Sequence, residues 1–298
     1  MSSERCFFMM NNVSEVNDFI TLLQTCQNWS DTIRVQLDNQ GQLQIDYSDP
    51  ELFGCLHISS SSTKNLTNNN ISKSISVILL SDQLIEALQQ FVQQCEQGII
   101  MELTENKTSH KRMKLLNIQH EFITHEVPIC DYRKRHQFFK LEDNHNFTSS
   151  PMLHVLFPRE EWKYIIYTFC IYAGNRGSAL EYNIKINEQG KPENIVEMKI
   201  TSESGNEVTQ SIRLRPNLDI HVTSLIDLKH CNSGNIHGYL LLHCLLNVVQ
   251  MSSLPGGESG ITTQMNEYGM MQTMDLFQRY RVSNFLVNAR DIDEKTYA

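Results

Sequence analysis

The eleven histidines and eight cysteines are the residues of this chain that could hold a metal or act as nucleophiles. No two cysteines have C-x-x-C spacing, and no two histidines have the H-x-x-x-H spacing that places both rings on one helix face. His120 and His125 flank a predicted strand and, five residues apart, would point to opposite faces. We therefore expect no metal site and no cofactor.

A catalytic site needs a nucleophile, a base and a group that orients the base. The chain has no G-x-S-x-G motif and no flanked catalytic cysteine. The glycine-rich run 255–260 lacks the lysine and hydroxyl of a phosphate-binding loop and precedes a predicted strand instead of a helix. We predict a non-enzymatic protein without catalytic residues, although a triad assembled from distant residues stays open.

Two basic clusters are the remaining candidates for binding chemistry. The first combines cations with aromatic rings in a polar stretch without clear periodicity, 130–150. It is open to four interpretations: a nuclear-import signal, a DNA contact, a partner groove or a solvated loop. Its residues are Tyr132, Arg133, Lys134, Arg135, Phe138, Phe139 and Lys140.

The second cluster lies at a predicted hairpin turn, where charges often do no more than keep a sheet edge soluble. We favour that structural role over binding. Its residues are Lys107, His110, Lys111, Arg112 and Lys114.

The formal charge of −9 argues against a protein that coats nucleic acid, because phosphate neutralisation needs a surplus of lysine and arginine. Any DNA contact must be local. No segment has the length of apolar sequence that crosses a membrane, and the first residues do not resemble a signal peptide. We expect no membrane association, and a nuclear or cytoplasmic location.

The elements that must position these residues follow from periodicity. Apolar residues recur with helical spacing over 13–26 and 84–95 in the first half. Strands surround both helices, and the turn at 38–41 predicts a hairpin. In the second half, a helix with Pro158 at its first position and another near 237–251 are again surrounded by strands.

An order of elements that repeats at half the chain length indicates a duplicated α+β domain. The polar stretch between the halves is the best linker. We predict domain 1 over 1–129, a connector over 130–150 and domain 2 over 151–298.

The doubled plan resembles the sliding-clamp family typified by PCNA. Local matches are similar to the HUS-type subunit of the heterotrimeric checkpoint clamp: SDQLIEALQQF, IIMELTENK and a strand containing Thr124 to Pro128, followed by a basic linker. The resemblance implies two tandem clamp domains, each with antiparallel sheets outside two helices. It also implies a ring of three subunits around double-stranded DNA, an ATP-driven clamp loader, and polymerase or repair proteins as partners.

In such clamps the connector borders a pocket that receives client peptides. The resemblance therefore implies partner docking by Tyr132, Arg133, Lys134, Arg135, Phe138 and Phe139. A clamp also lines its hole with basic helices. Here the first two helices hold no lysine or arginine, and the basic candidates for facing DNA are Arg159, Lys163 and Arg176.

This weak positive lining fits one subunit of a hetero-oligomeric ring whose partners supply charge, or a clamp-like protein that no longer encircles DNA. We expect a docking platform in DNA-damage checkpoint signalling and repair. The alternatives are a replicative polymerase processivity factor, cellular or viral, which would self-associate or act alone, and, further off, an enzyme with an unrecognised site or a structural protein.

Overall fold

The structure is a computed structural model with two compact units, which comprise mainly residues 1–138 (unit 1) and mainly residues 139–298 (unit 2). The described residues are 4–28, 30–38, 41–49, 52–59, 74–94, 98–106, 108, 110–117, 124–130, 153–173, 178–187, 189, 191–201, 205–215, 220–222, 235–251, 260–265, 271–276 and 280–286.

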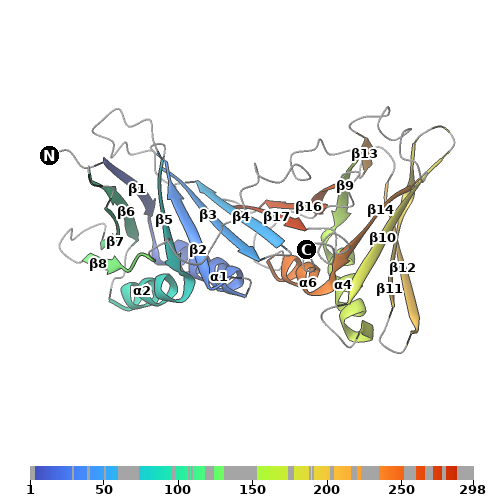
Figure 1. Cartoon of the computed structure of the whole chain (residues 1–298), viewed down its shortest axis with the longest axis horizontal. Helices are drawn as coiled ribbons and strands as arrows, with labels where there is room; N and C mark the ends of the chain where they lie inside the picture. Colours follow the sequence, from blue (N-terminus) through green and yellow to red (C-terminus); the bar gives the residue numbers. More distant parts are fainter. Residues whose placement is uncertain are drawn as a thin grey trace. The chain divides into compact units, whose positions relative to one another are not determined.

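Unit 1 contains two helices and two runs of neighbouring strands (Figure 1). In chain order its elements are β1 (Glu4–Met10), α1 (Val13–Gln27), β2 (Thr32–Leu37), β3 (Gln42–Asp49), β4 (Leu52–Ser59), β5 (Ile75–Leu80), α2 (Ser81–Gln94), β6 (Ile99–Glu105), β7 (Lys111–Asn117) and β8 (Thr124–Val127). The strands are neighbours in the orders β1-β6-β7-β8 and β5-β2-β3-β4.

Unit 2 has the same kind of organisation. Its elements are β9 (Leu153–Pro158), α4 (Arg159–Ala173), β10 (Ala179–Ile186), β11 (Pro192–Thr201), β12 (Glu207–Arg213), β13 (Ile220–Val222), β14 (Asn235–Leu241), α6 (Leu242–Met251), β15 (Gly260–Met265), β16 (Met271–Leu276) and β17 (Tyr280–Leu286). The strand orders are β14-β10-β11-β12 and β13-β9-β15-β16-β17.

The two units repeat one topology. In each, the first strand pairs antiparallel with the strand after the second helix: β1 with β6, and β9 with β15. The strand before the second helix pairs with the strand after the first: β5 with β2, and β14 with β10. Unit 2 adds the short β13 beside β9. The predicted α+β class and the duplication are confirmed.

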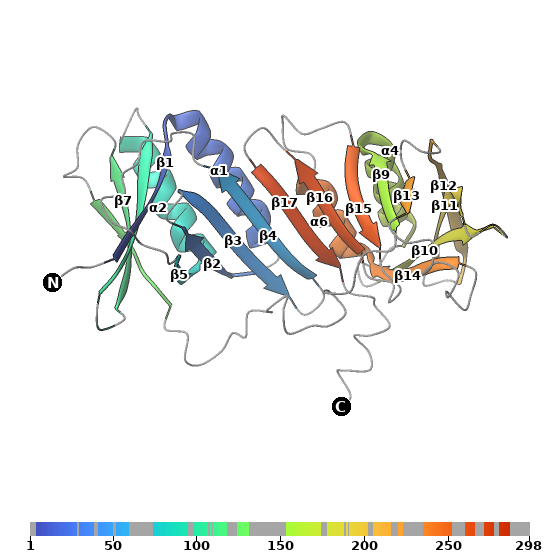
Figure 2. The ribbon, with the colours of Figure 1, turned by 90° about the horizontal axis from the view of Figure 1, so that it is seen from above.

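Each unit's helices pack against each other, α1 on α2 and α4 on α6. In unit 1 both helices lie on one face of the strands (Figures 1 and 2). Helix α1 begins with Asn12 as its N-cap: Asn12 Oδ1 accepts from the Glu15 N–H at 3.0 Å, and Glu15 Oε2 accepts from the N–H of the preceding residue, Asn11, at 3.0 Å. Of the residues on its predicted apolar face, Val13 is half-buried and the others are buried, namely Val16, Phe19, Ile20, Leu23 and Cys26.

Two helix starts in unit 2 were predicted wrongly. Pro158 is the last residue of β9 and α4 begins at Arg159. Residues 237–241 belong to β14, and α6 begins only at Leu242. The reason is burial with a period of two, since Ile236, Gly238 and Leu240 are buried while His237 is exposed.

The second basic cluster lies at the predicted hairpin turn, between β6 and β7, but not at a sheet edge. Strand β7, which carries Arg112 and Lys114, lies between β6 and β8 and pairs with both. Residues 131–150 of the predicted connector lie outside the described residues, so the domain boundaries stay a prediction. None of the helices in the described part of the chain has the length and hydropathy of a membrane span.

Candidate functional site

The outward faces of the four helices are the candidate functional surfaces, because the sequence predicted DNA contact there. In unit 1 these faces are acidic and rich in amides. The exposed side chains of α1 and α2 include Asn17, Asp18, Thr21, Gln24, Asp82, Glu86, Gln89, Gln90 and Gln93. Neither helix has a basic residue in its last turn to offset these charges. This face would repel phosphate.

Helix α4 carries the two described residues that were predicted to face DNA. Arg159 is only 7% exposed. Lys163 is paired with Glu160 at 3.1 Å, and its side chain is 17% exposed. Arg176 lies outside the described residues. Phosphate contact needs an accessible cation, so the burial of Arg159 and the ion pair of Lys163 weigh against strong DNA binding by α4. The assignment stays a prediction.

The outward face of α4 presents large apolar side chains instead. Tyr164 is 69% exposed, Tyr167 43%, Ile171 81% and Tyr172 57%. Tyr164, Tyr167 and Ile171 follow the i, i+3, i+7 spacing that places side chains on one helix stripe. We call these four residues the α4 aromatic face. Exposed apolar groups clustered in this way mark interaction surfaces, and tyrosine is favoured in protein interfaces.

The sequence contained a signal for this face that the sequence analysis missed. A helix on a protein surface should be polar on the side away from the core. Helix α4 buries Trp162, Ile165, Ile166 and Phe169, yet its opposite side has few polar residues. The structure shows that the four residues Trp162, Ile165, Ile166 and Phe169 fill the core side of the helix. The α4 aromatic face is therefore left on the surface.

Helix α6 adds no charge to unit 2. Leu242, Leu245, Val248 and Val249 are buried, and no acidic or basic residue lies in its first or last turn. His243 is half-buried. Beyond the exposed Glu160 and Glu161 of its first turn, α4 therefore offers an apolar surface, whereas the helices of the first half offer acids and amides.

The predicted partner-docking residues Tyr132, Arg133, Lys134, Arg135, Phe138 and Phe139 all lie outside the described residues. Their role stays a prediction.

Metal or thiol chemistry finds no support in the described residues. No three His, Cys, Asp or Glu side chains among them come together in a way that could hold a metal ion. Cys6, Cys26 and Cys244 are buried free thiols. Burial raises the pKa of the Cys26 thiol well above its ordinary value, which keeps it protonated and unreactive.

Two of the strands at the ends of these strand orders, β8 and β12, have one described neighbour each. Strand β8 pairs with β7, and β12 pairs with β11. A strand in this position presents backbone N–H and C=O groups to a further strand. Edge strands are therefore candidate contacts to other protein chains.

A comparison with protein-family models gives no match, and neither does a comparison with curated proteins. Among solved structures, the chain is similar to the PCNA2–PCNA3 complex of Sulfolobus tokodaii, with a TM-score of 0.58 and 12% sequence identity. The match covers 96% of this chain and 99% of that chain. Together with the repeated topology, this likeness shows that the chain has the two-domain, PCNA-like sliding-clamp fold.

Proposed function

We propose that the chain is a non-enzymatic DNA sliding-clamp subunit that acts mainly as a protein-docking platform in DNA-damage checkpoint signalling and repair. It would work in the nucleus, in a ring with two other clamp subunits that a clamp loader places on double-stranded DNA. Polymerases or repair proteins would be its clients.

The observation that carries this proposal is the chemistry of the helix faces. In a clamp the helices are the surfaces that track DNA, and tracking needs cations. Here α1 and α2 present acids and amides, and α4 presents three tyrosines and an isoleucine. Such a subunit suits a ring in which partners supply the positive lining.

The end strands β8 and β12 support assembly with other chains. A neighbouring clamp domain would extend the sheets by backbone hydrogen bonds at these strands. Strand β12 alternates exposed and more covered residues along Glu207–Arg213, as a strand does when only one face is packed.

Purification of the tagged full-length chain from cells that express it, with and without DNA damage, tests the proposal. We expect a stoichiometric complex with two other chains of clamp size, one copy of each. A stable monomer without partners would contradict it. A homo-oligomer that stimulates primer extension by a polymerase would favour the processivity-factor alternative instead.

Proline substitutions in β12 make this test specific. In an antiparallel pair, consecutive residues direct their N–H groups alternately toward the neighbouring strand and away from it. One of Thr209→Pro and Gln210→Pro should therefore remove an outward N–H, abolish the complex and leave thermal stability close to wild type. If both variants assemble normally, β12 is not the contact.

A further inference from the structure

A cavity of about 250 Å³ opens on unit 1 between β1, β6 and β7. Its lining includes three cations, a histidine and one carboxylate: Arg5, Glu102, His110, Arg112 and Lys114. We call it the basic pocket. The formal charge of these groups is positive in a chain whose net charge is −9.

Strand register brings these residues together from distant parts of the sequence. Arg5 pairs with Thr104, and Thr104 pairs with Arg112 on the other side. Two residues further along β6, Glu102 pairs with Lys114. All of these share one face of the sheet, because the residues between them, such as Cys6, Leu103 and Met113, are buried in the core.

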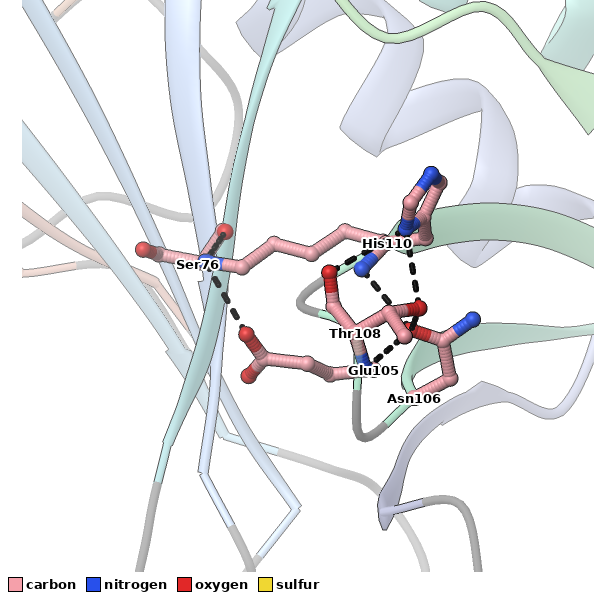
Figure 3. A network of polar contacts seen from close by, with 6 residues as sticks. Ser76, Glu105, Asn106, Thr108 and His110 are labelled. Atoms are coloured by element: carbon pink, nitrogen blue, oxygen red, sulfur yellow. Dashed lines mark hydrogen bonds and ion pairs between the residues drawn. The ribbon is translucent and has the colours of Figure 1, made fainter.

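Hydrogen bonds join Asn106, Thr108 and His110 between β6 and β7 (Figure 3). Asn106 Oδ1 accepts from the Thr108 N–H at 3.1 Å, from the Thr108 hydroxyl at 2.7 Å and from the His110 N–H at 2.9 Å. The His110 Nδ1 atom lies 3.0 Å from the Thr108 hydroxyl.

Lys111 does not belong to the pocket. Its Nζ donates to the Ser76 carbonyl at 2.8 Å and lies 4.0 Å from Glu105 (Figure 3). This pairing separates a structural lysine from the residues that line the cavity. The second basic cluster is thus two sets of residues with different roles.

The charges of the pocket are only partly compensated. Arg5 lies 3.5 Å from Glu102, which is 7% exposed and therefore covered. Arg112 lies 3.8 Å from Glu126, and both side chains are more than half exposed, so this pair is weak. Lys114 forms no ion pair with any described residue. The Arg112 guanidinium and the Lys114 ammonium can therefore donate to a ligand from one side of the sheet, and Arg5 adds positive charge beside them.

We propose that the basic pocket binds a phosphoryl group carried by a phosphorylated protein segment. Clustered arginines recognise phosphate through charge-assisted hydrogen bonds, and lysine adds a further donor. Duplex DNA needs a track of cations, whereas here the cations gather at one cavity and a carboxylate, Glu126, lies 3.8 Å from one of them, Arg112. A single dianionic group fits that distribution. The proposal does not depend on the clamp assignment.

Fluorescence anisotropy with the purified full-length chain tests the pocket. The probes are a pool of labelled degenerate peptides centred on phosphoserine, and the same pool with serine. We expect binding of the phosphorylated pool only, with competition by inorganic phosphate. Arg112→Gln combined with Lys114→Gln should weaken binding about tenfold or more, because each change removes a charge-assisted hydrogen bond.

Arg213→Gln, an exposed arginine in β12 of unit 2, is the matched control and should leave binding unchanged. Thermal melting of each variant checks that it remains folded, and Arg112→Gln alone replaces the double variant if that one is unstable. Equal binding of both peptide pools, or a double variant that binds normally, would overturn the proposal. The proposal would also be overturned if duplex DNA displaced the phosphopeptide at a lower concentration than inorganic phosphate does.

Discussion

Helices α1 and α4 occupy the same place in the two units, and each is 15 residues long. Counted from their first residues, the inward positions coincide. Val16, Phe19, Ile20 and Leu23 of α1 correspond to Trp162, Ile165, Ile166 and Phe169 of α4, and all are buried.

Several outward positions differ in chemistry, and buried Cys26 of α1 corresponds to exposed Tyr172 of α4. Asp18, Thr21 and Thr25 of α1 correspond to Tyr164, Tyr167 and Ile171 of α4. The duplicated fold therefore constrains the pattern of buried residues, since packing against sheet and partner helix is the same in both units. It does not constrain the solvent face, which is where the two units can acquire different functions.

The largest difference in stability between matched changes in the two units should come from removing the cation of an ion pair. In unit 1, Arg34 Nε donates to Asp46 Oδ2 at 2.7 Å, and Asp46 is fully buried. In unit 2, the pair between Lys185 and Glu197, at 3.3 Å, is exposed. Arg34→Met should lower the free energy of unfolding by about 3 kcal/mol, because it leaves a buried carboxylate without its cation.

Lys185→Met is the matched change and should cost less than about 1 kcal/mol. Urea unfolding measures both. Equal losses for the two variants would show that the buried pair of β2 and β3 is no more important than an exposed one.

A smaller difference in stability is expected between alanine substitutions at two glycines that lie at similar places in the two units. Gly98 precedes β6 and Gly260 begins β15. A Cβ on Gly98 would lie 1.9 Å from the Met10 carbonyl oxygen, whereas on Gly260 it would lie 2.6 Å from Leu156 Cδ1. Backbone cannot move aside as a side chain can, so Gly98→Ala should cost about 3 kcal/mol and Gly260→Ala about 1 kcal/mol. Thermal unfolding measures the stability loss of each variant. A larger loss for Gly260→Ala than for Gly98→Ala would contradict the packing described.

The smallest effect on stability is expected from a transplant of the α1 face onto α4. The triple variant Tyr164→Asp, Tyr167→Thr, Ile171→Thr alters exposed positions, so the free energy of unfolding should change by only about 1 kcal/mol in total. Partner binding should fall sharply if the α4 aromatic face is a contact. The reciprocal variant Asp18→Tyr, Thr21→Tyr, Thr25→Ile is the control. If the α4 variant recovers its partners as well as wild type does, the α4 aromatic face is not a contact to those partners.

Periodicity was sufficient to predict α1, α2 and the inward face of α4, because helical spacing is local. It failed at β14, where Leu240 and Leu241 of the strand run directly into Leu242 of α6 with no break in apolar sequence. His110, Arg112 and Lys114 of the basic pocket were recognisable as one cluster at a hairpin, but Arg5 was not, since it meets Arg112 only through β6 and pairing over that separation leaves no local signal. For the α4 aromatic face, the sequence shows apolar residues all around the helix but not which of them lack a neighbour.

Trp162 offers a way to follow the folding of unit 2 separately from that of unit 1. It is fully buried, and its ring lies 4.6 Å from that of Phe157 within unit 2. The chain has one other tryptophan, Trp29. With Trp29 replaced by phenylalanine, intrinsic fluorescence would come from a single indole in an apolar environment. Its emission would then report on the folding of unit 2 alone, and circular dichroism would follow both units.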